Sequence, residues 1–346
     1  MVSLKRELKV DIEYGCIFGC VGNAARYMNM DLKVMDIYIY GGGINQINYI
    51  RDKFSIGNPL QFEIMMAGMA KFNVDLRVCD RNPGTNPEAV WEEDRAYLCR
   101  DKPVIICCES GYLDYNTYFT RNKSMNHTVL LTGIDSDREL IRIADVYIPT
   151  QNIQSYIGEF PLRKATEARK IQNYTSLYFE GSYNKPQSTI HEEFFESIRR
   201  YMNPDKIEGV FEGIDLIPAF SHDLYELSKT IDTDKISELA NNIYFDIKMR
   251  GILTHRSIIG EYLAILNSTY SGYEKSVLMC IQYNDSIQVL WNRIMKKLIR
   301  WVTLKNYGYI DEILECLNQI YTLDVKLMNE LLSIGNDLRL GQTTQY

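Results

Sequence analysis

The distribution of apolar and polar positions divides the chain into two parts. In the first half, helix-compatible segments such as 59–72 and 89–101 alternate with short β-branched runs typical of buried strands. From about residue 185 these runs disappear, and apolar residues recur every three or four positions, as on one face of a helix. Gly181 and Pro186 flank polar residues between the two parts. We therefore expect two domains, over residues 1–180 and 185–346.

Each part has its own expected architecture. The runs "KPVIICCES" (102–110), "HTVLLTGID" (127–135) and "LIRIADVYI" (140–148) predict strands, and the polar separator "SDRE" predicts a hairpin turn between the last two. Helices followed by an antiparallel meander favour an α+β first domain. In the second part, an apolar series at helical spacing predicts a long helix with one buried face, and we expect an all-helical domain. The series comprises Ile287, Leu290, Ile294, Leu298 and Trp301.

Composition and charge exclude some function classes. The net charge of −7 argues against a general electrostatic grip on nucleic acid. The first ten residues are charged, and no window approaches the roughly 18 apolar residues that a membrane helix needs. The eight cysteines are irregularly spaced, which favours free thiols in a reducing compartment. We expect a cytoplasmic protein with no membrane or nucleic-acid partner.

The stretch "EYGCIFGCVGNAARYM" (13–28) holds two thiols four residues apart, Cys16 and Cys20. A cysteine becomes a nucleophile when a helix N-terminus and a neighbouring imidazole favour its thiolate. Gly19 can end an incoming loop, and the small residues 22–25 can form a first helical turn. This interpretation starts the helix near Cys20, makes Cys20 the candidate nucleophile, and leaves Cys16 in the approach loop.

Two further residues complete a candidate catalytic set. His127 opens a predicted strand, so its side chain is expected at the mouth of the sheet. Asp145 follows 18 residues later and would lie beside His127 if the two strands pair as a hairpin, where its carboxylate could orient the imidazole.

Two other interpretations of the thiols stay open. Cys20 could be buried packing, or Cys16 and Cys20 could bind a metal, although no second short-spaced Cys/His pair lies nearby to complete about four ligands. We expect no metal.

The segment "NHTVLLTGIDSDRELIRIADVYIP" resembles the His strand, turn and Asp strand of papain-like cysteine peptidases, particularly the bacteriocin-leader peptidases. The similarity extends to the N-terminal domain of the acyltransferase family of butirosin biosynthesis. It is carried there by Cys20 with Ala24, by "YIYGGGINQINYI" (38–50) and by "KPVIICCESGYLDYNTYF" (102–119), and covers about residues 15–150. The resemblance implies a papain-like cysteine-peptidase fold, an N-terminal helix packed on an antiparallel sheet, followed by a helical region.

The resemblance also implies an activity. An acyl group would leave a phosphopantetheine thioester on an acyl or peptidyl carrier protein, rest on Cys20, and pass to a small amine, in specialised-metabolite (antibiotic) biosynthesis and with no bound cofactor. His127 would act as base and Asp145 would orient it. Papain-like peptidases place an oxyanion Gln about six residues before the cysteine, where this chain has Tyr14. Tyr14, Cys16 and Gly19 are therefore the candidates for completing the oxyanion site or lining it.

Two alternative functions remain at this point. One is a cysteine peptidase of the bacteriocin-leader type, and the other is a non-catalytic protein that binds the carrier. The basic stretches 161–170 and 293–300 could grip an acidic carrier, although a solvated helix face is the commoner use of such a pattern.

Overall fold

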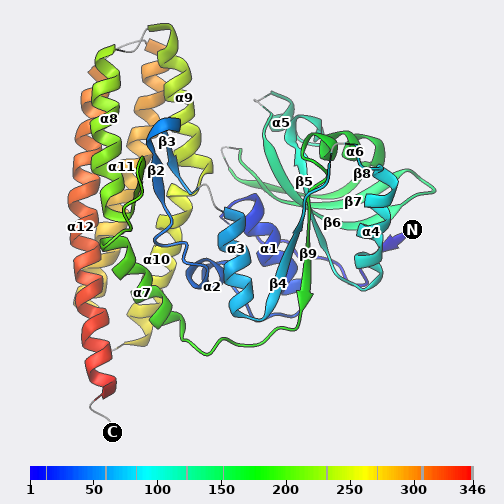
Figure 1. Ribbon diagram of the computed structural model, residues 1–346, viewed down its shortest axis with the longest axis horizontal. Coiled ribbons are helices and arrows are strands. Elements are labelled where there is room, and N and C mark those ends of the chain that lie inside the picture. Colours follow the sequence, from blue (N-terminus) through cyan, green and yellow to red (C-terminus); the bar gives the residue numbers. More distant parts are fainter. Residues whose placement is uncertain are drawn as a thin grey trace. The chain divides into compact units, whose positions relative to one another are not determined.

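The computed structural model describes residues 1–343 apart from positions 13, 59, 60, 83, 122, 123, 151, 231, 232, 271 and 305–307. The chain divides into two compact units (Figure 1). The first consists of residues 1–37 and 61–187, and the second of residues 38–60 and 188–346. The boundary near residue 187 falls where the composition changes. The sequence did not suggest that residues 38–60 leave the first unit and join the second.

The first unit is α+β and is organised by one antiparallel sheet. Six strands follow the order β4-β9-β5-β6-β7-β8, and a short β1 also pairs with β6. Their bounds are Val2–Ser3 (β1), Val74–Cys79 (β4), Val104–Glu109 (β5), Asn126–Asp135 (β6), Leu140–Ile148 (β7), Gln154–Pro161 (β8) and Ser176–Gly181 (β9). The three predicted strands and the hairpin turn at 136–139 are confirmed.

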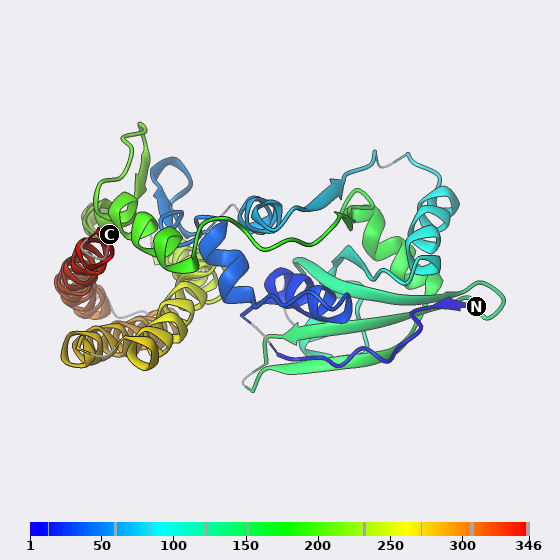
Figure 2. The same cartoon turned by 90° about the horizontal axis from the view of Figure 1, so that it is seen from below.

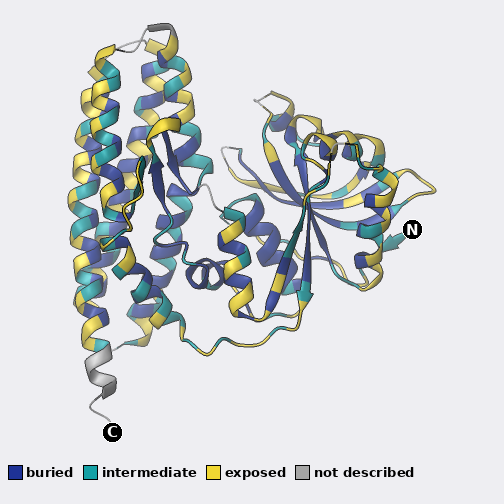
Figure 3. Cartoon of the chain, in the orientation of Figure 1, coloured by how far each residue is buried: buried dark blue, intermediate teal, exposed yellow. Residues whose placement is uncertain are grey.

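Helices cover the sheet of the first unit. The helices are α1 (Cys16–Tyr27), α3 (Gln61–Lys71), α4 (Pro87–Cys99), α5 (Thr117–Arg121), α6 (Leu162–Ile171) and the short 3-10 helix η2 (Ser110–Tyr112). Apolar residues of α4 and α6 pack with alternate residues of β5 and β6, such as Ile106 and Val129, in one buried core. Helix α1 packs on β6 and β7, and α3 packs on β4 and α1. Figure 3 shows the middle strands as the most buried part of this unit.

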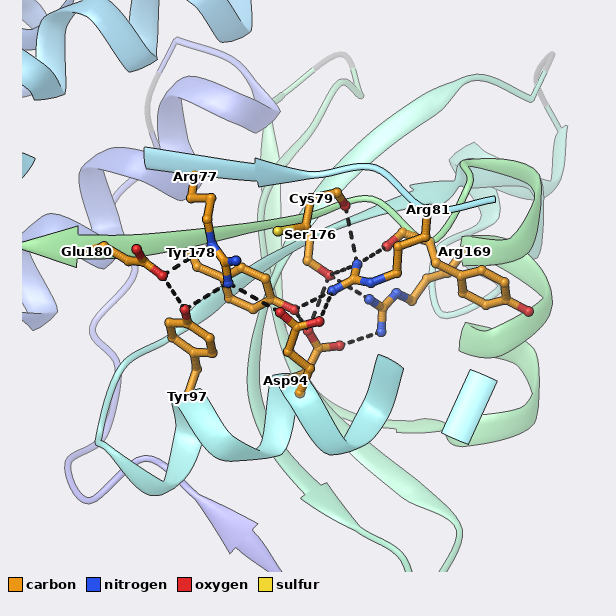
Figure 4. A network of polar contacts seen from close by, with 11 residues as sticks. Arg77, Cys79, Arg81, Asp94, Tyr97, Arg169, Ser176, Tyr178 and Glu180 are labelled. Atoms are coloured by element: carbon orange, nitrogen blue, oxygen red, sulfur yellow. Dashed lines mark hydrogen bonds and ion pairs between the residues drawn. The ribbon is translucent and has the colours of Figure 1, made fainter. Parts of the chain in front are cut away.

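A polar network connects these helices to the sheet (Figure 4). Arg169 of α6 forms an ion pair of 2.7 Å with Asp94 of α4, and neither side chain has solvent-exposed surface. Asp94 also accepts hydrogen bonds from Ser176 and Tyr178 of β9. The stretch 161–170 is thus only partly a solvated basic face, since Arg169 points inward and neutralises a buried carboxylate.

The second unit consists mainly of helices, most of them long. They are α2 (Val34–Tyr40), which spans the boundary between the units, α7 (Ile190–Met202), α8 (Leu216–Thr230), α9 (Thr233–Met249), α10 (Ile252–Thr269), α11 (Glu274–Leu304) and α12 (Gly308–Thr343). Figure 2 looks along the longest of these helices, and α11 packs against α9, α10 and α12. All five residues of the predicted apolar series in α11 are buried, which confirms that helix face.

The second domain is mainly helical, as expected, but it is not all-helical. A small antiparallel sheet joins β2 (Asn48–Ile50) and β3 (Ser55–Gly57) to β10 (Val210–Glu212), with 3-10 helices η1 (Arg51–Lys53) and η3 (Gly213–Asp215) beside it. Tyr49 of β2 packs on Phe211 and Phe220. Because the strands are short and form few backbone hydrogen bonds, these aromatic contacts stabilise the sheet. Strands of three residues are too short to show an alternating pattern, which is why the sequence did not reveal them. Among the described residues, no helix combines the length and apolar character needed to cross a bilayer.

Candidate active site

Helix α1 begins one full turn earlier than its sequence suggests. Gly15 is the N-cap residue and Cys16 the first helical residue, and the amide of Gly19 already donates to the carbonyl oxygen of Gly15 at 2.8 Å. Gly19 therefore lies inside the helix instead of ending a loop. Since the first N–H groups of a helix have no acceptor within it, Cys16 stands where the positive end of the helix dipole favours a thiolate.

The predicted hairpin brings His127 and Asp145 together. Strand β6 pairs with β7 in the register Leu130↔Ala144 and Leu131↔Ile143. This register sets the two residues on neighbouring strands, and Nε2 of His127 lies 2.9 Å from Oδ2 of Asp145. Both side chains are buried, His127 with 2% and Asp145 with 0% of its surface exposed. The imidazole is therefore held through Nε2, and its Nδ1 is left for another partner.

Three donors converge on the carboxylate of Asp145. Besides His127, the hydroxyl of Tyr115 donates to Oδ2 at 2.7 Å, and the backbone amide of Tyr147 donates to Oδ1 at 3.1 Å. Tyr115 is fixed in turn by stacking on Tyr156, with ring centroids 4.2 Å apart. Charge-assisted hydrogen bonds of this kind stabilise a buried carboxylate and fix its orientation.

The imidazole of His127 faces Cys16. Burial alone would raise the pKa of the Cys16 thiol, but the hydrogen bond and positive charge of His127, together with the backbone of Thr128, lower that pKa below its ordinary value. Burial would likewise lower the pKa of His127, but the charge and hydrogen bond of Asp145 and the interaction with Cys16 raise it. Both shifts favour a thiolate and imidazolium pair. Cys16 as a residue keeps some solvent-exposed surface, whereas Cys20 has none.

Cys20 has a different environment. Its thiol donates to the carbonyl oxygen of Thr128 at 3.5 Å, and the side chain is 0% exposed. Burial, followed by the negative charges of Cys16 and Asp145, raises the pKa of Cys20 well above its ordinary value. The structure thus corrects the expected geometry: the thiol that meets His127 at the helix start belongs to Cys16, and Cys20 is packed one turn further along.

The other predicted positions have mixed outcomes. Tyr14 is half-buried just ahead of the N-cap residue, whereas Gly19 is buried as the fourth residue of α1.

Two residues that position the imidazole were not predicted from the sequence, namely Tyr115 and Phe119. The ring of Phe119 lies 4.9 Å from that of His127 and packs against it. The signal for both was the aromatic segment "LDYNTYF" (113–119) ahead of β6.

In the part of the chain that the structure describes, no group of three or more His, Cys, Asp or Glu side chains is arranged to hold a metal ion. Comparison with known proteins adds no further assignment: no protein-family model matches the chain, and no curated protein matches it. The chemistry of the site is therefore read from its own geometry.

Proposed function

We propose that this protein is a cysteine-dependent acyltransferase that uses Cys16, His127 and Asp145 to form an amide from a carrier-bound thioester. The observation that carries the proposal is the set formed by Cys16, at the start of α1, and an imidazole held 2.9 Å from a buried carboxylate, with the imidazole lowering the pKa of the Cys16 thiol. A thiol paired with an oriented imidazole is the arrangement that nucleophilic cysteine catalysis requires.

The first half-reaction would form an acyl-enzyme. The Cys16 thiolate attacks the carbonyl carbon of the thioester, and a new carbon–sulfur bond forms. When the tetrahedral intermediate collapses, the bond to the phosphopantetheine sulfur breaks, and the imidazolium of His127 donates its proton to that leaving thiolate. His127 is then neutral and Cys16 carries the acyl group.

The second half-reaction would transfer the acyl group to a small amine. Neutral His127 removes a proton from the amine as its nitrogen attacks the Cys16 thioester. Collapse of this second intermediate releases the amide and returns the thiolate beside the imidazolium. Asp145 favours this return because its charge raises the pKa of His127.

The oxyanion would be bound by backbone amides at the start of α1. The N–H groups of Cys16 and Ile17 belong to the first helical turn, where no intrahelical acceptor exists. With Cys16 as nucleophile, the position six residues earlier is Val10, which has no side-chain donor. The side-chain role assigned to an oxyanion Gln in papain-like peptidases would therefore fall to other groups, among which Tyr14 is the nearest in the chain.

The resemblance to the butirosin acyltransferase family supports the finer parts of the proposal: a papain-like fold for the first unit, an acyl or peptidyl carrier protein as donor, and a place in specialised metabolism. The antiparallel sheet with α1 packed on it is compatible with that fold. The same set of residues would also serve a leader peptidase, so the assay must separate the two reactions.

The test supplies the purified full chain with an acyl group loaded on a carrier protein, together with a primary amine. Amide formation that depends on Cys16 is the expected result, with the free acid as a minor product. Cleavage of a double-glycine leader peptide without amide formation would replace the proposal by the peptidase. A protein that binds the loaded carrier but yields neither product nor acyl adduct would be the non-catalytic alternative.

A further inference from the structure

A pocket of about 410 Å³ opens in the first unit between α3, the end of β4 and the turn from α6 to β9. Its lining combines apolar side chains with exposed carboxylates, and the described residues that line it include no lysine or arginine. Phe62 and Met66 of α3 and Ile171 at the end of α6 supply apolar surface, while Glu63 and Asp80 supply the two negative charges. A volume of this size is typical of a site for a small organic group.

The floor of this pocket is formed by β5 and by the start of β6, the strand that carries His127. Cys107 of β5 lines the pocket and pairs across the sheet with Thr128 of β6. The carbonyl oxygen of Thr128 in turn accepts a hydrogen bond from the thiol of Cys20 at 3.5 Å, and Cys20 lies one turn along α1 from Cys16. Asn126, on the rim of the pocket, directly precedes His127. The pocket thus lies beside the segment of β6 that carries His127 and Thr128.

Cys107 itself is unsuited to chemistry. It is 1% exposed, and burial, followed by the charges of Cys108 and Cys16, raises the pKa of its thiol. A buried neutral thiol behaves as a small apolar side chain. Cys107 therefore serves as part of the pocket floor, and Cys16 remains the reactive thiol beside it.

We propose, resting on the proposed function, that this pocket holds the acyl group while it is attached to Cys16, and that it selects acyl groups with an apolar body and a hydrogen-bond donor, an ammonium or a hydroxyl, at the far end. The apolar walls contact the body of the group. The carboxylates of Asp80 and Glu63 attract the donor and repel an acyl group that ends in a carboxylate.

The test uses chloroacetamides, whose chloride is displaced by the Cys16 thiolate as the new carbon–sulfur bond forms. Three reagents carry matched tails: N-butyl, N-(4-aminobutyl) and N-(3-carboxypropyl). Peptide mass spectrometry measures the labelling of Cys16 relative to Cys99, an exposed thiol of the same chain that serves as internal reference. Intrinsic differences in reagent reactivity cancel in this ratio.

The ratio of Cys16 to Cys99 labelling should be about tenfold higher for the aminobutyl than for the carboxypropyl reagent, because the exposed carboxylates attract one charge and repel the other. Asp80→Asn should reduce this preference to about threefold or less. Asp75→Asn is the matched control, because it removes the same charge from an exposed position of β4 outside the pocket. Equal ratios for all three tails, or equal effects of the two substitutions, would overturn the charge selection.

A second pair of variants tests the apolar walls. Met66→Trp should fill the pocket and slow N-butyl labelling of Cys16 relative to tail-free iodoacetamide, whereas Ala67→Trp, at an exposed position of the same helix, should not. Alkylation needs only the thiolate and the pocket. If Cys16 discriminates between the chloroacetamide tails but is never acylated by a thioester, the proposed function is refuted and the pocket is a binding site for another ligand. If a thioester acylates Cys16 but neither the tail nor Met66→Trp changes the labelling of Cys16, only the assignment of the pocket to the acyl group is refuted.

Discussion

Replacing Asp145 by Asn should disable the thiol without removing it. His127 and Tyr115 donate to one oxygen of Asp145 and the amide of Tyr147 donates to the other, so an Asn side chain with one acceptor oxygen cannot satisfy all three. The substitution also removes the charge that stabilises the imidazolium. A hydrogen bond to a charged group contributes about 1.5–3 kcal/mol, which corresponds to about a 10- to 100-fold smaller equilibrium constant for the thiolate and imidazolium pair.

The assay is the rate of iodoacetamide labelling at pH 7, with Cys16 and Cys99 separated by peptide mass spectrometry. The ratio of Cys16 to Cys99 labelling should fall by up to about 100-fold in Asp145→Asn, because only the thiolate reacts. Asp135→Asn, at the opposite end of β6, is the matched control and should leave the ratio unchanged. Circular dichroism at the assay temperature establishes that both variants are folded. An unchanged ratio in folded Asp145→Asn would refute the role of Asp145.

Three other outcomes follow from the same contacts. Cys20→Ala should keep the Cys16 labelling rate within about threefold, and loss of labelling in a folded variant would contradict this. The same variant should lower the free energy of unfolding by about 1 kcal/mol in a urea titration, because it deletes a buried thiol with one weak hydrogen bond. Asp94→Ala should lower the free energy of unfolding by about 3–5 kcal/mol, because it leaves the buried Arg169 unpaired, whereas the exposed Asp75→Ala should cost less than about 0.5 kcal/mol. The labelling rate of Cys16 should be level across neutral and alkaline pH, because the thiolate persists when His127 loses its proton, and should fall on the acid side as the thiolate is protonated at its lowered pKa. A single rise at the ordinary pKa of a thiol would exclude the ion pair.

The hairpin that unites His127 and Asp145 could be predicted because its signals are local. Both strands are β-branched apolar runs, and a polar separator of four residues joins them, so pattern and register lead to the same pairing. The conclusion that the two residues lie close together needed no knowledge of the remaining chain.

The start of α1 could not be predicted in the same way. No Ser, Thr, Asp or Asn stands at its N-cap position, and Gly19 and Gly22 inside the helix are typical of a loop or a break. The helix forms there because tertiary packing buries the side chains of Ile17, Phe18 and Val21. Local propensity favoured a start near Cys20, and burial moved it to Cys16, which changes the thiol that faces His127.

The acyl pocket also lay beyond the sequence. Its walls come from α3, β4, β5 and the turn between α6 and β9, which are separated by up to about a hundred positions along the chain. Cys107 and Thr128 meet only because β5 and β6 pair in one particular register. Such a site depends on which strands are neighbours, and an amphipathic pattern carries no information on that order.

The most direct test of the account is the site of acylation by a simple acyl thioester. Intact-protein mass spectrometry of the wild type, Cys16→Ala and Cys20→Ala, followed by peptide mapping, locates the adduct. The account predicts one acyl adduct on Cys16 in the wild type and in Cys20→Ala, removed by hydroxylamine, and none in Cys16→Ala. An adduct on Cys20, or one that persists in Cys16→Ala, would contradict it.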